Sequence, residues 1–366
     1  MPDLPTSPSA NTLRTSHSPT HAQQRMEQLE AALDGPLSDA TYRTKDELRR
    51  LAQYRAPPAP MDYPKKRLAA VLVLLHLNPR GELSVTLTTR SMRLRSHPGE
   101  TALPGGRWEE GDGEGGEWTA LREASEEIAL PLPSSSSTPH MLYLCTLSAF
   151  TSRTLLVVLP VVYLLLHPAL SASTFLEQTL RPNPDEVDSI FHLPLRSFLM
   201  LDDEGEEVGG KAASSPIPLD ADEAAVFCTD AAPLPPAPAS PAAERPAPGT
   251  ETLTHSFTDF TWLLDLPYRL HRFSHPFPGV TPSAVTGLTA DIVLEVALLA
   301  SYGPSELGAE QELKEGRIGF ERHAPGQMRW SEIVQEAMRM QGEKGLAGLV
   351  SRDAEGEEGQ ERPSET

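Results

Sequence analysis

Two apolar runs most constrain what this chain can fold into. The first, Leu68–Leu77 (LAAVLVLLHL), follows the basic triplet Lys65–Arg67. The second, Leu155–Leu166 (LLVVLPVVYLLL), is interrupted by Pro160. Both are well short of the roughly 20 apolar residues that a helix needs to span a bilayer. They therefore predict buried strands in a soluble protein.

Further elements are predicted on either side of these strands. The turn at residues 78–81 leads into a second strand at Glu82–Thr89, so the two strands form a hairpin. Apolar patterns predict more strands at 141–148, 257–266 and 268–273, and a strand or turn that begins at 186. Helices are expected at 24–55, 119–130 and 288–302, and outside the core at 327–340. This order of elements predicts an α+β fold.

Proline shows where the chain is not packed. The 366 residues include 36 prolines, about twice the usual share of roughly 5%, and seven of them lie within residues 233–248. The predicted organisation is a disordered segment at 1–23 and a domain at 24–302 that contains a low-complexity insertion at 203–252. An acidic, partly helical extension at 303–366 follows.

Charge and cysteine content exclude some classes of protein. The net charge of −20 argues against a nonspecific nucleic-acid binder, which needs a basic face. Two cysteines, Cys145 and Cys228, are too few for a disulfide-rich secreted scaffold. No basic segment followed by an apolar one is found near the N-terminus, so an intracellular location is expected.

A cluster of acidic residues carries the most specific chemical signal. Residues 119–130 contain good helix formers and neither Pro nor Gly. Glu123, Glu126 and Glu127 share the spacing i, i+3, i+4, which puts three carboxylates on one helical face. Because such like charges repel, a bound divalent cation explains them better than a solvated helix does. Oxygen ligands of this kind suit Mg²⁺ or Mn²⁺.

A glycine-rich loop precedes this helix. Gly105 and Gly106 follow Pro104, and glycine allows backbone conformations that are closed to other residues. Such a loop can fold back over the start of the helix. The combined pattern predicts a site for a diphosphate bridged by the metal.

Together, the loop and helix resemble the Nudix box, G-x5-E-x7-R-E-U-x-E-E-x-G-U, in which U is aliphatic. The matching positions are Gly106, Arg122, Glu123, Glu126, Glu127 and Leu130. Asp112 stands where the box has its first Glu, nine residues rather than seven separate Asp112 from Arg122, and Ala129 replaces the box Gly. Because the additional residues precede the helix, we expect the carboxylate face to be preserved.

A second motif directly abuts the first. Residues 86–106 (TLTTRSMRLRSHPGETALPGG) resemble the signature L-L-T-x-R-[SA]-x3-R-x3-G-x3-F-P-G-G of the coenzyme A diphosphatases, with Thr86 and Leu103 in place of Leu and Phe. Arg90, Arg93 and Arg95 also bring three positive charges together, which suits a polyanionic ligand. The alternative is a solvated basic turn that balances the acidic loop.

The resemblance implies an α/β/α sandwich around a mixed sheet. It implies metal-dependent hydrolysis of the diphosphate bond of coenzyme A or acyl-CoA, to 3′,5′-ADP and 4′-phosphopantetheine or its acyl form. Mg²⁺ or Mn²⁺ would be held by Glu123, Glu126 and Glu127, with Arg122 orienting a glutamate. The implied substrate-binding residues are Arg90, Arg95, Gly105 and Gly106.

Several alternatives stay open at this stage. The catalytic base is not assigned, and Glu186 is either a residue that orients water or metal or a surface carboxylate. The substrate is either coenzyme A or another nucleoside diphosphate, such as ADP-ribose or an oxidised nucleotide. A noncatalytic ligand-binding module is a further alternative. Related enzymes act in peroxisomes or mitochondria, although this sequence shows no clear targeting signal for either.

Overall fold

The computed structural model describes residues 19–59, 62–132, 140–199, 253–262, 266–274, 284–303, 318 and 320–340. The expected insertion at 203–252 lies wholly outside the described residues. So do residues 1–18 of the expected N-terminal segment and most of the C-terminal extension.

The centre of the fold is an eight-stranded mixed sheet. The two apolar runs form β1 (Leu68–Leu77) and β7 (Val157–Leu165), which pair in parallel from Leu68–Val157 to Leu75–Leu164. The other pairings are antiparallel, and the main path runs β3-β2-β1-β7-β5, with β4 paired to β1, β6 to β7 and β8 to β2. The remaining strands are β2 (Leu83–Arg90), β3 (Thr101–Ala102), β4 (Gly105–Arg107), β5 (Met141–Thr146), β6 (Phe150–Thr151) and β8 (Val187–Pro194).

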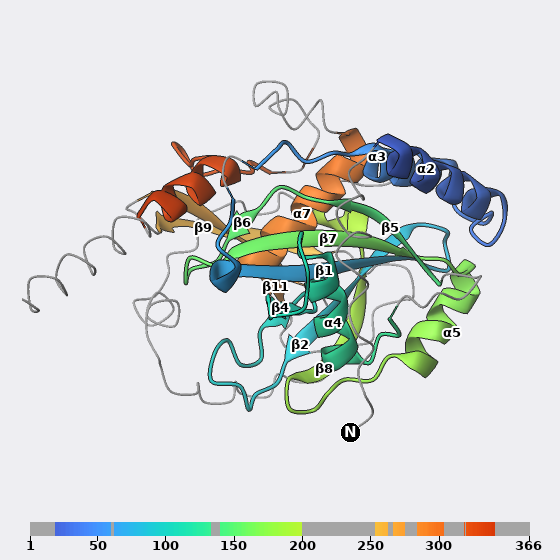
Figure 1. The fold of residues 1–366 in the computed structure, drawn as a ribbon, viewed down its shortest axis with the longest axis horizontal. Helices are drawn as coiled ribbons and strands as arrows, with labels where there is room; N and C mark the ends of the chain where they lie inside the picture. The colour runs from blue at the N-terminus through green and yellow to red at the C-terminus, as the bar shows by residue number, and fades with distance from the viewer. Residues whose placement is uncertain are drawn as a thin grey trace, which may run out of the picture.

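Side chains of β1 alternate between two hydrophobic cores, because successive residues of a strand point to opposite faces of the sheet. Ala69, Val73, Leu75 and Leu77 join one core, whereas Ala70, Leu72 and Leu74 join the other. Helices α4 (Glu117–Ile128) and α5 (Ala169–Thr179) cover the second face, and α2 (Pro19–Asp34), α3 (Tyr42–Gln53) and α7 (Gly287–Tyr302) cover the first (Figure 1). The expected α/β/α sandwich is therefore confirmed.

A second, three-stranded sheet has the order β11-β10-β9, with β9 at Thr254–Thr261, β10 at Pro267–Ser274 and β11 at Ala284–Thr286. Two buried histidines on it form a hydrogen-bonded chain: His271 Nε2 lies 2.8 Å from the Arg322 carbonyl oxygen, and His271 Nδ1 lies 3.0 Å from His255 Nε2. Since a carbonyl oxygen only accepts, His271 Nε2 carries the proton and His255 Nε2 donates to His271 Nδ1.

Most predicted elements are present, including the hairpin of β1 and β2 and helix α7. Two expectations were wrong. Helix α2 begins at Pro19, inside the segment expected to be disordered. Residues 330–340 are helical as expected, but they do not lie outside the core, because Val334 and Met338 are buried against the first residues of β1 and β7. Among the described residues, no helix combines the length and apolarity needed to cross a membrane.

Candidate active site

The site begins where β4 leads into α4. Gly105 pairs with Val71 and Gly106 with Ala70 of β1. A Cβ atom at Gly105 would lie 2.4 Å from the Ala70 carbonyl oxygen, whereas a Cβ atom at Gly106 would lie 2.4 Å from Glu123 Oε1. Glycine at these two positions therefore lets the loop lie directly on β1 and beneath the helix.

Both ends of α4 use left-handed backbone conformations. Gly116, before the first turn, has a φ of 75°, which glycine adopts without steric cost. Ala129, after the last turn, has a φ of 55°, and its N–H donates to the Ala124 carbonyl oxygen. Ala129 stands where the Nudix box has Gly, so the helix ends with the geometry expected of glycine although the residue is alanine.

Asp112 anchors the long loop to α4. Its side chain is only 3% exposed and accepts hydrogen bonds from the Glu109 N–H and the Thr119 hydroxyl, both at 2.9 Å. Arg122 donates to both of its oxygens, from Nε at 3.0 Å and from Nη2 at 3.1 Å. Burial alone would raise the pKa of Asp112, but these hydrogen bonds outweigh it and the pKa is lowered.

Arg122 also pairs with two of the three predicted metal ligands. Its Nη2 lies 3.0 Å from Glu123 Oε1, and its Nη1 lies 3.0 Å from Glu126 Oε2. The side chain of Arg122 is 13% exposed and that of Glu126 is 43% exposed. One guanidinium therefore holds Asp112, Glu123 and Glu126 in fixed relative positions.

Glu127 is the most buried of the three glutamates. Its Oε2 accepts a hydrogen bond from the Gly105 N–H at 3.1 Å, which joins the helix to the glycine loop. Burial, together with the nearby charges of Glu123 and Glu186, raises the pKa of Glu127 to about 8. Burial likewise raises the pKa of Glu123, and this effect is larger than the lowering by the positive charge of Arg122.

A turn before β8 brings Glu186 to this cluster. The Arg181 N–H donates to the Ile128 carbonyl oxygen at 3.0 Å, and the Asn183 N–H donates to that of Glu127 at 2.8 Å. The turn is thus docked on the last residues of α4. Glu186 lies close enough to influence both Glu123 and Glu127 electrostatically. The role of Glu186 is open from the sequence alone, because its approach to α4 depends on a turn about 60 residues further along the chain.

The two predicted substrate-binding arginines differ in their surroundings. Arg90 ends β2 within electrostatic range of Glu127, and its positive charge lowers the pKa of that carboxyl. Arg95 is exposed on the loop that follows. This loop is fastened to the Glu186 turn, because the Ser91 N–H donates to the Glu186 carbonyl oxygen at 2.8 Å and Arg93 pairs with Asp185 at 3.1 Å.

The donor set fits a hard divalent cation by its chemistry. Across the described ranges, no three His, Cys, Asp or Glu side chains converge closely enough to hold a metal ion as they stand. In this structure Arg122 holds Glu123 and Glu126, while the Gly105 N–H holds Glu127. All three offer the carboxylate oxygens that Mg²⁺ and Mn²⁺ prefer. A cation would also offset the burial and repulsion that raise the pKa values of Glu123 and Glu127.

An α/β/α sandwich that presents a glycine loop and an R-E-x-x-E-E helix defines a class of phosphate-anhydride enzymes. Residues 66–209 match the family model described as NUDIX domain. The chain is 37% identical over 150 residues to the uncharacterized Nudix hydrolase NudL of Photorhabdus laumondii, a match covering 41% of this chain and 71% of that protein. The chain belongs to the Nudix hydrolase family.

Eukaryotic relatives match a smaller share of their own length. Nudix hydrolase 15, mitochondrial, of Arabidopsis thaliana is 40% identical over 141 residues, which cover 37% of this chain and 42% of that protein. The peroxisomal coenzyme A diphosphatase ndx-8 of Caenorhabditis elegans is 39% identical over 131 residues, which cover 36% of this chain and 50% of that protein. The chain therefore spans about half the length, or less, of these two relatives.

Proposed function

We propose that this protein hydrolyses the diphosphate bond of coenzyme A and its derivatives, giving 3′,5′-ADP and 4′-phosphopantetheine or the acyl form. The observation that carries the proposal is that the Gly105 N–H, at the end of the upstream motif, donates to the buried Glu127 carboxylate at 3.1 Å, within electrostatic range of Arg90. A guanidinium beside a carboxylate helix suits a ligand whose several phosphates are partly neutralised by metal. The likeness to ndx-8, named as a coenzyme A diphosphatase, supports the same substrate class.

Glu123, Glu126 and Glu127 would hold Mg²⁺ or Mn²⁺. When bound, the cation would neutralise diphosphate oxygens and lower the pKa of a water ligand. Arg122 keeps Glu123 and Glu126 oriented, and its own charge is balanced by Asp112. These residues therefore supply a preorganised acidic surface, the main requirement for phosphoryl transfer.

The glycine loop and two arginines would bind the substrate. Gly105 and Gly106 bring the loop backbone against β1 and against the Glu123 carboxylate, and the phosphates of the substrate would bind beside this loop. Arg90 would contact the phosphates next to the carboxylates, and Arg95 would reach a more distant phosphate from its exposed position.

The proton acceptor is one of the cluster's carboxylates. Glu186 is a candidate, because it lies within electrostatic range of Glu123 and Glu127 and is half-buried. Glu127 is the other candidate, since its carboxylate is buried in the same cluster beside the Gly105 N–H. Single substitutions of each residue to Gln, compared by the pH dependence of kcat, separate the two candidates.

Product analysis tests the proposed activity. Purified protein with Mg²⁺ or Mn²⁺ receives coenzyme A, ADP-ribose and 8-oxo-dGTP in competition, and the products are separated by chromatography. We expect 3′,5′-ADP and 4′-phosphopantetheine to form fastest. Preferential cleavage of either other substrate would assign a different nucleoside diphosphate, and binding without cleavage would indicate a noncatalytic module.

We propose that the protein acts in peroxisomes or mitochondria. The support is limited to relatives whose names place them there, ndx-8 in peroxisomes and Nudix hydrolase 15 in mitochondria. Imaging of the tagged full chain beside markers for both organelles tests this location. A purely cytosolic signal would contradict it.

A further inference from the structure

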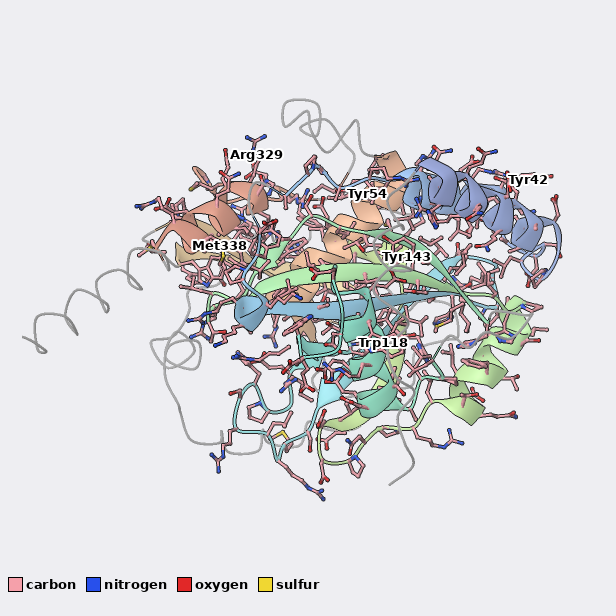
Figure 2. All side chains as sticks on the ribbon, viewed as in Figure 1. Tyr42, Tyr54, Trp118, Tyr143, Arg329 and Met338 are labelled. Atoms are coloured by element: carbon pink, nitrogen blue, oxygen red, sulfur yellow. The ribbon has the colours of Figure 1, made fainter. Side chains whose placement is uncertain are left out.

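The helix at residues 330–340 bears one continuous apolar stripe. Trp330, Val334 and Met338 are spaced i, i+4, i+8 and so lie on the same face of the helix. Val334 is 1% exposed and Met338 is 7% exposed. Figure 2 shows Met338 at the end of the molecule opposite Tyr42. This helix lies outside residues 66–209, which match the family model.

The first residue of the stripe packs among aromatic rings. The Trp330 ring lies 5.0 Å from the ring of Phe150 in β6, 5.7 Å from that of Trp262 and 6.1 Å from that of Tyr268 in β10, measured between centroids. Such tilted and edge-on pairs stabilise an interface beyond the area they bury. The helix is thereby fixed to the second sheet.

The other end of the stripe reaches the entry of the Nudix-box loop. Val334 and Met338 share a buried cluster with Leu68, Ala149 and Val157, and Trp108 packs against this cluster. Trp108 is the residue that follows β4, so it begins the loop between β4 and α4. The C-terminal helix and the loop therefore pack against one hydrophobic cluster.

Trp108 also holds the loop in shape. Its Nε1 donates to the Gly113 carbonyl oxygen at 2.9 Å, across the residues that include Asp112. The Lys65 ammonium lies 4.8 Å from the centre of the Trp108 ring and 2.8 Å from Glu114 Oε1. The Trp108 side chain thus holds the loop through its hydrogen bond to Gly113 and through its contact with Lys65, which also pairs with Glu114.

A second contact leads from the same cluster to α4. Leu159 of β7 packs against the cluster and also lies beneath Gly116, where an added Cβ would come within 3.1 Å of its Cδ1. The loop that is closed by Trp108 carries Asp112, and Asp112 holds Arg122 through two hydrogen bonds. An unbroken series of contacts therefore joins the C-terminal helix to the residue that orients Glu123 and Glu126.

We propose that Trp108 is a positioning residue through which the helix at 330–340 sets the geometry of the metal-binding carboxylates. Loosening the helix lets the loop open, so that Asp112 no longer fixes Arg122 and metal binds less tightly. The proposal rests on the proposed function for its catalytic readout. Its first readout, the mobility of the loop, is independent of that function.

Three variants of the full chain test the coupling. Met338→Ala removes packing from the cluster, Trp108→Phe removes the Nε1 donor but keeps an aromatic ring, and Gln335→Ala changes an exposed residue of the same helix as the control. Hydrogen–deuterium exchange of residues 108–116 is measured at a temperature where each variant is fully folded. We expect exchange in this loop to accelerate about tenfold in Met338→Ala and Trp108→Phe, and to be unchanged in Gln335→Ala.

The catalytic readout is the Mn²⁺ concentration that gives half-maximal hydrolysis. We expect this concentration to rise about fivefold in Met338→Ala and Trp108→Phe, with a nearly unchanged KM for coenzyme A. Unchanged loop exchange in Met338→Ala, despite a lower Tm, overturns the proposal whatever the enzyme hydrolyses. Faster exchange in a protein that cleaves no diphosphate would support the coupling and contradict the proposed function.

Discussion

Gly106 leaves free the space that the Glu123 carboxylate occupies. A Cβ atom at this position would lie 2.4 Å from Glu123 Oε1 and 2.5 Å from its Cδ. The neighbouring Gly105 is constrained differently, because its Cβ would lie 2.6 Å from the Cα atom of Val71 in β1. One glycine makes room for a flexible side chain, and the other makes room for backbone.

Alanine substitutions should separate these two roles. Gly106→Ala is expected to fold, because a carboxylate can move, and to lose about 100-fold in metal-dependent activity as Glu123 is displaced. Gly105→Ala is expected to lower the free energy of unfolding by about 3 kcal/mol, because backbone of a central strand cannot move aside. Thermal denaturation and activity assays distinguish them. Full activity in Gly106→Ala would remove Glu123 from the site.

Removal of Asp112 should destabilise the protein. Asp112→Ala leaves the largely buried Arg122 without its bidentate partner, so we expect a loss of about 3 kcal/mol in the free energy of unfolding. Denaturant titration measures this loss. Glu110→Ala changes an exposed carboxylate of the same loop and serves as the control. Equal stability of the two variants would show that the buried pair contributes nothing.

Glu126→Gln should keep the fold and remove most turnover. Glu126 is the most exposed of the three glutamates, so its neutralisation leaves the cores intact. We expect kcat to fall at least 100-fold at saturating Mg²⁺, since the variant lacks one charged oxygen ligand. Circular dichroism checks the fold. Retained turnover would count against the assignment of this face as the metal site.

Ala129→Gly should stabilise the protein. An L-residue in the left-handed region carries a steric cost of about 1 kcal/mol, which glycine avoids. The free energy of unfolding is therefore expected to rise by about 1 kcal/mol. Ala124→Gly, inside the same helix, should change stability in the opposite direction because glycine weakens helix interiors. A loss of stability in Ala129→Gly would contradict the observed helix end.

The histidine chain on the second sheet should make the protein acid-sensitive. Burial lowers the pKa of His255 to about 3 and that of His271 to about 4, so the folded state resists protons that the unfolded chain accepts near its ordinary pKa of 6.5. Stability is therefore complete above pH 6.5 and falls as the pH drops toward 4. Each histidine contributes about 2 kcal/mol to the loss between pH 7.5 and 5.

Comparison with a variant isolates this effect. His255→Phe keeps a ring beside Phe320 but removes one titrating group. Denaturant titrations at pH 7.5 and 5 should show a pH-dependent loss smaller by about 2 kcal/mol than in the unchanged protein. His97→Gln, at an exposed histidine, is the control. An unchanged loss in His255→Phe would exclude His255 from the acid response.

Local pattern was enough to predict the framework of the site. The apolar runs predicted the buried strands β1 and β7, and the spacing of Glu123, Glu126 and Glu127 predicted the carboxylate face of α4. Each of these patterns lies within a stretch of about 12 consecutive residues or fewer. The i, i+4 pairing of Arg122 with Glu126 was predictable for the same reason.

Contacts between distant segments were not predictable in the same way. Glu186 meets α4 only because the turn at 181–187 hydrogen-bonds to the end of that helix. Asp112 matched a motif position, but its burial and its four hydrogen bonds depend on how the Gly-rich loop closes. Helix 330–340 appeared peripheral because its short apolar stripe does not reveal which surface it covers.

The folded unit extends well beyond the segment that relates this chain to its family. Core residues Leu29 and Leu48 come from α2 and α3, Ile292 from α7 and Val334 from the helix at 330–340, all outside residues 66–209. A fragment trimmed to the matching segment would expose to water the core side chains that these elements cover, and we expect it to aggregate on expression. A protein prepared for mutational surveys or inhibitor screens should therefore include all the helices that pack on the core, and not only the segment that carries the family motif.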